Sequence, residues 1–449
     1  MKLAFHHTCL WCLTALLCVS HGAIAHERDS VVQSAIASPE TKDNKLSVDL
    51  QLLSHGEARN GGMPQGATES KTNFIMGRER LVIDFERPGL ETKLNIQHSG
   101  VWGQSGKGAF NVFEAWAKMS AKNGLFAQIG RLALAYDDER IIGTNDWAMA
   151  ALSHDALRVG YEGHGHKAHL VLAYNQNAEN VNNGGSYYVN GAQPYKSMQT
   201  VWYHYDIPNF PLGASLLFMN LGMQGGEKDV DEHTEHQQLL GGFIQFTPKH
   251  WAVEGSYYHQ FGKSEEGIKI DAWMASAKVK YIPSNKYDFQ VGFDYLSGDE
   301  LFAVPAKGTI GMTQHKVIKG FNPIYGSHHK FYGAMDFFYV STYVNGFTPG
   351  LQNTYFGASY KPIKGLTLQA SYHYLAMATK LIDIDKTLGH ELEAQGSYIF
   401  TKDIRLSAGF SYMTGTKNME KLRRASSDGR LRWGWISLNI SPRIFTTKW

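Results

Sequence analysis

Apolar and polar residues alternate in short segments that recur along the chain after about residue 45. A period of two places one face of a strand against an apolar environment and the other face against polar surroundings. The gaps between these segments are themselves alternately short and long. Strands of roughly ten residues, joined by tight turns at one end and long loops at the other, are typical of transmembrane β-barrels. The pattern therefore predicts a barrel of this kind.

The clearest predicted strands lie at 287–296, 366–375 and 404–413. In the first of them, apolar side chains occupy the odd positions from Tyr287 onward, and polar residues or glycine occupy the even positions from Asp288 onward. The phase is ambiguous in two further segments, near 126–134 and 213–222, which only their spacing identifies as strands.

The gaps set the number of strands. The short ones lie near 87–90, 121–123, 163–166, 207–212, 248–250, 282–286, 362–365 and 401–403. The long ones lie near 54–77, 103–109, 133–153, 176–197, 223–237, 262–270, 297–351, 376–389 and 415–430. They imply an all-β fold, an antiparallel transmembrane β-barrel of about 18 strands with short periplasmic turns and long extracellular loops. A soluble β-sandwich or β-solenoid is the alternative, but neither explains long loops all on one side without a fixed repeat.

The first 25 residues have the features of a secretory signal peptide. An apolar stretch follows Lys2 and ends before Ala23-Ile24-Ala25, which matches a small-x-small cleavage site. All three cysteines precede that site, so the mature chain has no disulfide, thiol catalyst or four-cysteine zinc site. The expected organisation is a signal peptide at 1–25, a periplasmic lead-in at 26–44 and the barrel at 45–449.

Charge and hydropathy exclude two other classes of protein. The formal net charge is +2, without the basic patch of a nucleic-acid-binding protein. After the leader, no apolar run is long enough for a transmembrane helix. Aromatic residues gather near segment ends, where the girdles of a barrel meet the membrane interfaces. They are Trp102, Trp202, Tyr203, Trp251, Tyr257, Tyr258, Trp433 and Trp435.

A barrel of this size is too wide for side chains to fill, so its inward residues determine its chemistry. Alternation assigns to the inner face the basic residues Lys45, Arg80, Lys93, Lys118, Arg158, Lys278, Lys280, Lys361 and Arg405. It assigns there the acidic residues Asp49, Asp84, Glu86, Glu91, Glu114, Glu162, Asp206, Glu254, Asp288, Asp294, Glu391 and Glu393. A lumen of one sign selects ions of the other sign. This mixed lumen predicts that many of the charges pair along the wall.

The densest run of charges extends from Arg131 to Glu162 and includes Trp147. A long loop with paired opposite charges can fold into the pore as a constriction, or it can remain a solvated outer loop. Charge alone leaves both interpretations open. A second long loop, 297–351, is a candidate lid or plug because structureless loops of this length are usually functional.

The segment GRLALAYDDERIIGTNDWAMAALSHDALRVGYE resembles the motif region of the alginate-export family of outer-membrane barrels, which includes relatives of unsettled function in Bacteroidetes-type bacteria. The matching positions are Gly130, Arg131, Tyr136, Arg140, Gly143, Trp147, Asp155 and Ala156. Later stretches, FDYLSGD from Phe293 and FNPIYGSHHKFYGAMD from Phe321, also resemble the family. Together with the strand spacing, the resemblance covers most of the mature chain.

This resemblance implies a monomeric pore of about eighteen strands. The best-known family member secretes alginate through a constriction rich in arginine and lysine, and Arg131, Arg140 and Arg158 are the positions that could serve similarly here. The lumen departs from that pattern because its acidic residues match or exceed its basic ones, which argues against the export of a polyanion and makes a less selective porin a plausible alternative. The full set of candidate pore-lining or constriction residues is Arg131, Arg140, Arg158, Glu162, Lys93, Lys278, Arg405 and Glu254.

Two other patterns resemble metal sites. His164, His166 and His169 could bind a transition metal, but a periplasmic turn predicts solvent-exposed histidines instead. Asp383 and Asp385 suggest a calcium loop, but the spacing does not match an EF-hand. We predict no metal and no cofactor.

The leading functional hypothesis is an outer-membrane channel of the alginate-export type that passes hydrophilic solutes or an oligo- or polysaccharide. The alternatives are a general, weakly selective porin, an outer-membrane enzyme using His373 beside Ser371, and a surface adhesin. We expect no enzymatic activity. The expected partners are the lipid bilayer, lipopolysaccharide, the transported solute and the barrel-assembly machinery, which would bind the last strand ending at Trp449, and no nucleic acid.

Overall fold

The computed structural model describes residues 43–60, 71–104, 108–189, 191, 193–299, 317–336, 349–381, 383–423 and 430–449. The chain divides into two units, Met1–Asp43 and Asn44–Trp449, and the description below concerns the second. The predicted signal peptide and nearly all of the predicted lead-in lie outside the described residues.

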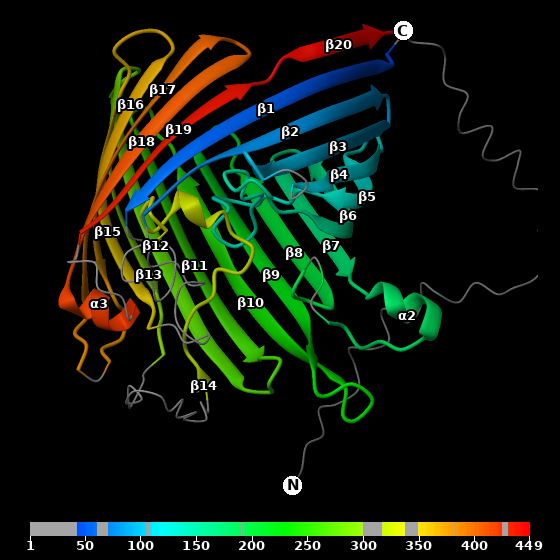
Figure 1. Cartoon of the computed structure of the whole chain (residues 1–449). Helices are drawn as coiled ribbons and strands as arrows, with labels where there is room; N and C mark the ends of the chain where they lie inside the picture. The colour runs from blue at the N-terminus through cyan, green and yellow to red at the C-terminus, as the bar shows by residue number, and fades with distance from the viewer. Residues whose placement is uncertain are drawn as a thin grey trace, which may run out of the picture. The chain divides into compact units, whose positions relative to one another are not determined.

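Strands make up most of the second unit, and all of them pair antiparallel except the short strand Val317–Ile318 (Figure 1). They are β1 (Lys45–Asn60), β2 (Lys71–Arg87), β3 (Leu90–Val101), β4 (Ala109–Ser120), β5 (Leu125–Leu132), β6 (His154–Gly163), β7 (His166–Tyr174), β8 (Ser197–Asp206), β9 (Leu212–Gly225), β10 (His233–Phe246), β11 (Trp251–Lys263), β12 (Lys269–Ser284), β13 (Tyr287–Leu296), β14 (Val317–Ile318), β15 (Leu351–Tyr360), β16 (Leu366–Ala376), β17 (Thr387–Thr401), β18 (Ile404–Gly415), β19 (Arg430–Ile440) and β20 (Arg443–Lys448). Short helical turns occur at α2 (Ala178–Asn183), η2 (His328–Lys330) and α3 (Lys417–Arg423). Among the described residues, no helix has the length and hydrophobicity needed to cross a membrane.

The sheet closes on itself, because β1 pairs with β2 on one side and with β19 and β20 on the other. β19 and β20 are two parts of one strand, interrupted at Ser441 and Pro442, where proline has no amide hydrogen to donate. The Pro442 carbonyl still accepts from the Leu50 amide at 3.0 Å. β14 belongs to a loop and is not a strand of the barrel wall. With β19 and β20 counted as one strand, the described residues form a closed barrel of 18 strands, as the alternation predicted.

The positions of the turns and loops confirm the predicted order of short and long connections. The turn between β2 and β3 lies within the predicted gap 87–90, and the loop 133–153 occupies the whole gap between β5 and β6. The predicted gap 54–77 is too wide, because β1 and β2 stay paired up to Asn60 and Lys71. Both faces of that extension carry polar residues, so it lacks the alternation from which strands are predicted.

The outer face of the wall is apolar. Side chains more than a third exposed there include Leu94, Ile129, Leu216, Phe356, Phe410 and Ile436. Exposed aliphatic and aromatic residues in alternate positions are what a lipid-facing wall requires.

The predicted aromatic girdle is only half right. Trp102, Tyr203, Trp251 and Tyr257 are well exposed. In contrast, Trp202, Tyr258 and Trp433 are buried and Trp435 lines a cavity inside the barrel. Adjacent positions such as Tyr257 and Tyr258 point to opposite faces of a strand, so proximity to a strand end could not place both of them outside.

Two segments fold into the barrel, and we call them the first inner segment (133–153) and the second inner segment (317–336). The first carries Leu134, Ile141 and Ile142, which are almost completely buried, and the second carries Phe321, which is fully buried. Apolar residues in a loop would be costly to expose to water, and the lumen provides surfaces that cover them.

The two inner segments are joined directly. The Gly143 amide donates to the Tyr325 carbonyl at 2.8 Å, and the Tyr325 amide donates to the Ile141 carbonyl at 3.1 Å. Gly326 lets the backbones approach, since a Cβ atom there would lie 2.1 Å from the Arg140 carbonyl oxygen. The segments therefore form one body across the lumen.

Candidate functional site

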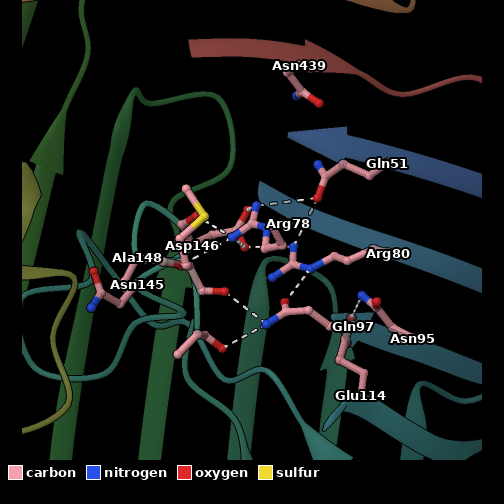
Figure 2. Close-up of polar contacts among 12 residues, drawn as sticks. Gln51, Arg78, Arg80, Asn95, Gln97, Glu114, Asn145, Asp146, Ala148 and Asn439 are labelled. Atoms are coloured by element: carbon pink, nitrogen blue, oxygen red, sulfur yellow. Dashed lines mark hydrogen bonds and ion pairs between the residues drawn. The ribbon is translucent and has the colours of Figure 1, made fainter. Parts of the chain in front are cut away.

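The first inner segment is anchored to the wall by two arginines of β2 (Figure 2). Arg78 and Arg80 are two residues apart on one strand, so both side chains point inward, and both are buried. The Arg80 guanidinium lies 2.7 Å from the Asp146 carboxylate, and Arg78 donates to the Asp146 carbonyl at 2.9 Å. Both arginines also donate to the side-chain oxygen of Gln51 on β1.

A glutamine of β3 extends this anchor. Gln97 accepts a hydrogen bond from Arg80 Nε at 2.7 Å and donates to the Met149 carbonyl at 2.9 Å (Figure 2). The Arg80 guanidinium also lies over the Phe113 ring, 4.2 Å from its centroid. Arg78 and Arg80 together carry two positive charges, while Asp146 supplies one negative charge. The anchor therefore retains one excess positive charge.

Arg140 holds the other end of the first inner segment. Its side chain is buried, donates to Asp294 of β13 at 2.7 Å and to Asp138 at 2.8 Å, and lies over the Phe331 ring at 3.9 Å. Burial by itself lowers the pKa of Arg140, but Asp294, Tyr332 and Asp138 outweigh burial and raise that pKa. Arg140 is thus a permanently charged anchor with its charge compensated.

Asp137 attaches the same segment to the opposite wall. Its carboxylate accepts hydrogen bonds from Trp202 at 3.0 Å, Ser215 at 2.5 Å and Tyr258 at 3.3 Å. These donors lie on β8, β9 and β11, so the segment spans from β2 across to these strands. A carboxylate with several neutral donors is stabilised without a cation.

The second inner segment is fixed to the first and to the wall. Ser327 donates to Glu139 at 2.7 Å, and Lys330 forms an ion pair with the same carboxylate. Burial alone raises the pKa of Glu139, but Lys330 and Ser327 lower it overall. On the wall side, the Met335 amide donates to Glu391 of β17 at 2.8 Å.

Aromatic and histidine rings fill the junction between the two inner segments and the closing strands. Trp147 stacks on His329 with ring centroids 4.3 Å apart, and the Trp435 ring meets Trp147 edge to face at 4.9 Å. On β1, His55 contacts both tryptophans, with its ring centroid 5.0 Å from that of Trp147 and 5.8 Å from that of Trp435.

Beside the second inner segment lies a cavity of about 390 Å³, which we call the lumen cavity. Its lining extends from the inner segments, at His329 and Tyr332, toward residues near the short-turn ends of the strands, such as Asp288 and Ser359. About half of the lining side chains are amides, hydroxyls or aromatic rings, and the lining also includes three lysines and three carboxylates.

Many of the charged residues of the inner wall are paired, as the mixed composition predicted. Lys278 contacts Glu254 at 2.6 Å, and Lys280 contacts Asp288 at 3.2 Å, both across neighbouring strands. Other cross-strand pairs are Lys45 with Glu86, Lys118 with Glu91, Lys93 with Asp84 and Glu114, and Arg443 with Asp49. These pairs compensate much of the wall charge, while Arg158 and Arg405 form no ion pair with a described residue.

The structure separates the three arginines that the family resemblance brought together. Arg131 does not face the lumen, because β5 continues to Leu132 and Arg131 shares the outward side with Ile129. It pairs there with the Asp155 carboxylate at 2.7 Å, at an exposed hollow of the outer wall. The ambiguous alternation of this strand concealed which way Arg131 points. Gly130, beside it, has φ 131° and lies against the Ala115 carbonyl.

The other predicted residues are inside the barrel but scattered. Arg158 donates to Gln128 at 2.5 Å, and Glu162 lies 2.9 Å from His169. Arg405 lies near the short-turn end of β18, and no described residue forms an ion pair with it. Among the motif positions, Tyr136, Arg140, Gly143 and Trp147 belong to the first inner segment.

Sequence reasoning missed Arg78, Asp146 and the inward position of Trp435. The signal for the first was present, since Arg78 and Arg80 share a face of β2, but only Arg80 was assigned inward. Asp146 could not be paired with them in advance, because no local pattern states which wall a long loop will contact.

The alternative chemical sites lack the required geometry. Ser371 donates to Glu393 at 2.6 Å, while His373 Nδ1 lies 2.9 Å from Asn353, so the hydroxyl is not bonded to the imidazole. His169 is buried against Tyr136. Across the described ranges, no group of three or more histidine, cysteine or carboxylate side chains is placed to hold a metal.

Comparisons with known proteins agree with this architecture. A family model described as "Alginate export" matches residues 38–387. Among curated proteins, none matches the chain in sequence. Solved structures share the fold: OccK5 (OpdH) of Pseudomonas aeruginosa is 12% identical with a TM-score of 0.58, covering 90% of this chain and 99% of that chain. OccAB1 of Acinetobacter baumannii is 12% identical with a TM-score of 0.59, covering 89% of this chain and 97% of that chain. A BenF-like porin from Pseudomonas fluorescens Pf-5 is 11% identical with a TM-score of 0.59, covering 89% and 99%.

Proposed function

Because this chain belongs to the alginate-export family, we propose that it is a constricted channel for uncharged or weakly charged hydrophilic solutes, including oligosaccharides, rather than a dedicated exporter of a polyanion. Family and fold together identify an outer-membrane channel. The proposal concerns what passes through it, and it places the constriction at the two inner segments.

Charge compensation carries this proposal. A channel for polyanions needs free positive charge along its path. Here Lys278 and Lys280 are paired on the wall, and Arg140 is buried between Asp294 and Asp138. A solute that depends on hydrogen bonds and not on charge meets the amides and hydroxyls of the lumen cavity.

One observation favours the second candidate, a channel for anionic saccharides. The anchor of Arg78, Arg80 and Asp146 has one excess positive charge at the constriction. A single charge of this kind gives a weak anion preference, in contrast to the strong selectivity of a lumen rich in arginine and lysine.

The reversal potential of the purified channel in planar bilayers under a potassium chloride gradient tests the proposal. We expect a permeability ratio of chloride to potassium near unity for the wild type. Asp146→Asn should increase the chloride preference roughly threefold, because a unit charge about 6 Å from the path contributes about 0.7 kcal/mol in water. Asp155→Asn is the matched control, since its ion pair lies on the outer face.

Strong anion selectivity in the wild-type channel would contradict the proposal and favour the polyanion exporter. An Asp146→Asn channel with wild-type selectivity would show that the path does not pass the anchor. A protein that inserts into the bilayer and conducts no ions would contradict the channel itself.

A further inference from the structure

Two aromatic rings that line the lumen cavity lie flat against the wall. Trp435 of β19 is paired in register with Gly409 of β18, and a Cβ atom at Gly409 would lie 2.5 Å from the indole. Tyr355 of β15 is paired with Gly292 of β13, where a Cβ atom would lie 2.2 Å from the phenol ring. Each ring therefore occupies the space above a glycine of the neighbouring strand.

This arrangement orients the rings toward the lumen. A ring that covers a glycine has one face against the backbone, so its other face is turned from the wall. Tyr355 is buried, with the His373 ring nearly parallel to it at 5.3 Å between centroids, so of the two rings Trp435 is the one that stays partly exposed. Trp435 is only partly buried and lines the cavity beside Trp147, whose ring meets it edge to face at 4.9 Å between centroids. Aromatic faces of this kind bind apolar C–H surfaces and supply large contact area.

Uncharged hydrogen-bonding groups surround the rings. The cavity lining includes Gln290, Asn353, Ser359, Gln369, Gln395 and Ser411. Within the described part of the chain, no side-chain hydrogen bond engages Gln290, Ser359 or Ser411. These groups can donate to and accept from a solute. The lysines at the same cavity are already paired with Asp288, Glu254 and Glu139.

We infer that the lumen cavity is a binding subsite for a neutral saccharide, in which a pyranose ring stacks on Trp435 and its hydroxyls bond the surrounding amides and hydroxyls. A pyranose combines an apolar C–H face with a rim of hydroxyls, and the cavity offers a partner for each. Its volume of about 390 Å³ lies within the range of about 300–1,000 Å³ of small-molecule sites. This inference rests on the proposed function, because it names the class of solute that the channel would carry.

Sugar-induced block of the ion current tests the subsite in full-length protein in planar bilayers. The neutral probes are maltotriose and cellotriose, and the charged probe is a trimer of guluronate. We expect at least one neutral sugar to block the current in a saturable way and at lower concentration than the uronate. Trp435→Ala should raise the half-blocking concentration about five- to tenfold, the loss expected for one aromatic contact.

Two variants separate stacking from structural damage. Trp435→Phe keeps an aromatic face and should restore most of the block. Trp251→Ala removes an exposed tryptophan of the outer face and should leave the block unchanged. Calorimetry of the same sugars with detergent-solubilised protein measures binding independently of conductance.

A channel that conducts, but that neither neutral sugar blocks or binds, overturns the subsite and leaves the proposed channel intact. Block that is unchanged in Trp435→Ala, or stronger with the uronate, also overturns it. Sugar binding in detergent by a protein without any conductance would retain the subsite and contradict the proposed function.

Discussion

Arg140 shows how one side chain can hold a loop in place inside the lumen. A buried guanidinium is tolerated only with its charge compensated, and here Asp294 belongs to the wall while Asp138 belongs to the loop. The ion pair with Asp294 therefore fixes the first inner segment, which is a loop, to a strand of the barrel wall.

Arg140→Met should release the first inner segment from the wall. Removing one partner of a buried ion pair costs about 3–5 kcal/mol, because the other charge is left uncompensated. Hydrogen exchange of residues 133–153 should accelerate, and the single-channel conductance should rise. The double variant Arg140→Met with Asp294→Asn should recover part of the protection, and unchanged exchange in the single variant would refute the anchoring role.

For individual residues, the sequence predicts which charged side chains are candidates for the site better than it predicts on which face or element they lie. It identified Arg131, Arg140 and Arg158 as candidates, but they lie on the outer face, in a loop inside the lumen, and on the inner wall. Alternation could not decide the side of Arg131 because β5 has an ambiguous phase. The partner of Arg140 lies 154 positions away, beyond any local pattern.

Among the elements, the second inner segment carries a group that responds to acid. His328 is buried in it, and burial lowers its pKa to about 4. Because the unfolded segment has an ordinary histidine pKa near 6.5, the packed segment favours the neutral ring. Its stability is then fully present above about pH 6.5 and decreases as the pH falls from there toward 4.

Acid should therefore loosen the second inner segment by up to about 3 kcal/mol over this range. Hydrogen exchange of residues 317–336, corrected for the chemical exchange rate, should show this loosening between pH 6.5 and 4. His328→Gln removes the titration and should flatten the dependence, while His164→Gln, in the turn between β6 and β7, should not alter it. An equally steep dependence in His328→Gln would assign the effect to other groups.

The strands and the inner segments differ in how far the sequence predicts them. A strand between lipid and water must alternate, so β13, β16 and β18 were predicted almost to their ends. For the first inner segment the sequence predicts a loop, but it does not indicate whether this loop folds into the pore or stays in the solvent outside. Its placement depends on Asp137 and Asp146 meeting donors on β2, β8, β9 and β11, which only the closed barrel brings within reach.

For the whole molecule, the barrel closes where β1 pairs with the last strand, β19 and β20, and we call this pairing the closing seam. Backbone hydrogen bonds run along it to the end, where the Asn44 amide donates to the Trp449 carbonyl at 3.1 Å. The ion pair of Asp49 with Arg443 crosses the same seam but is exposed. Exposed pairs add little to stability.

Arg443→Ala should consequently leave the denaturant midpoint of the folded barrel in lipid vesicles unchanged. Removal of residues 443–449 deletes the backbone partners of Lys45–Asp49 on β1 and should prevent recovery of a folded, heat-resistant barrel. A large loss of stability in Arg443→Ala would show that the seam depends on its side chains.

The same seam has a consequence for the time at which the barrel can form. β1 is the first strand of the barrel along the chain, yet one of its two partners is the last strand of the described barrel. Until that last strand has been synthesised, one edge of β1 exposes a row of unpaired amides and carbonyls, which can pair with other chains. The barrel therefore cannot close gradually while its strands are being synthesised. The free edge of β1 needs protection until the last strand of the barrel is available.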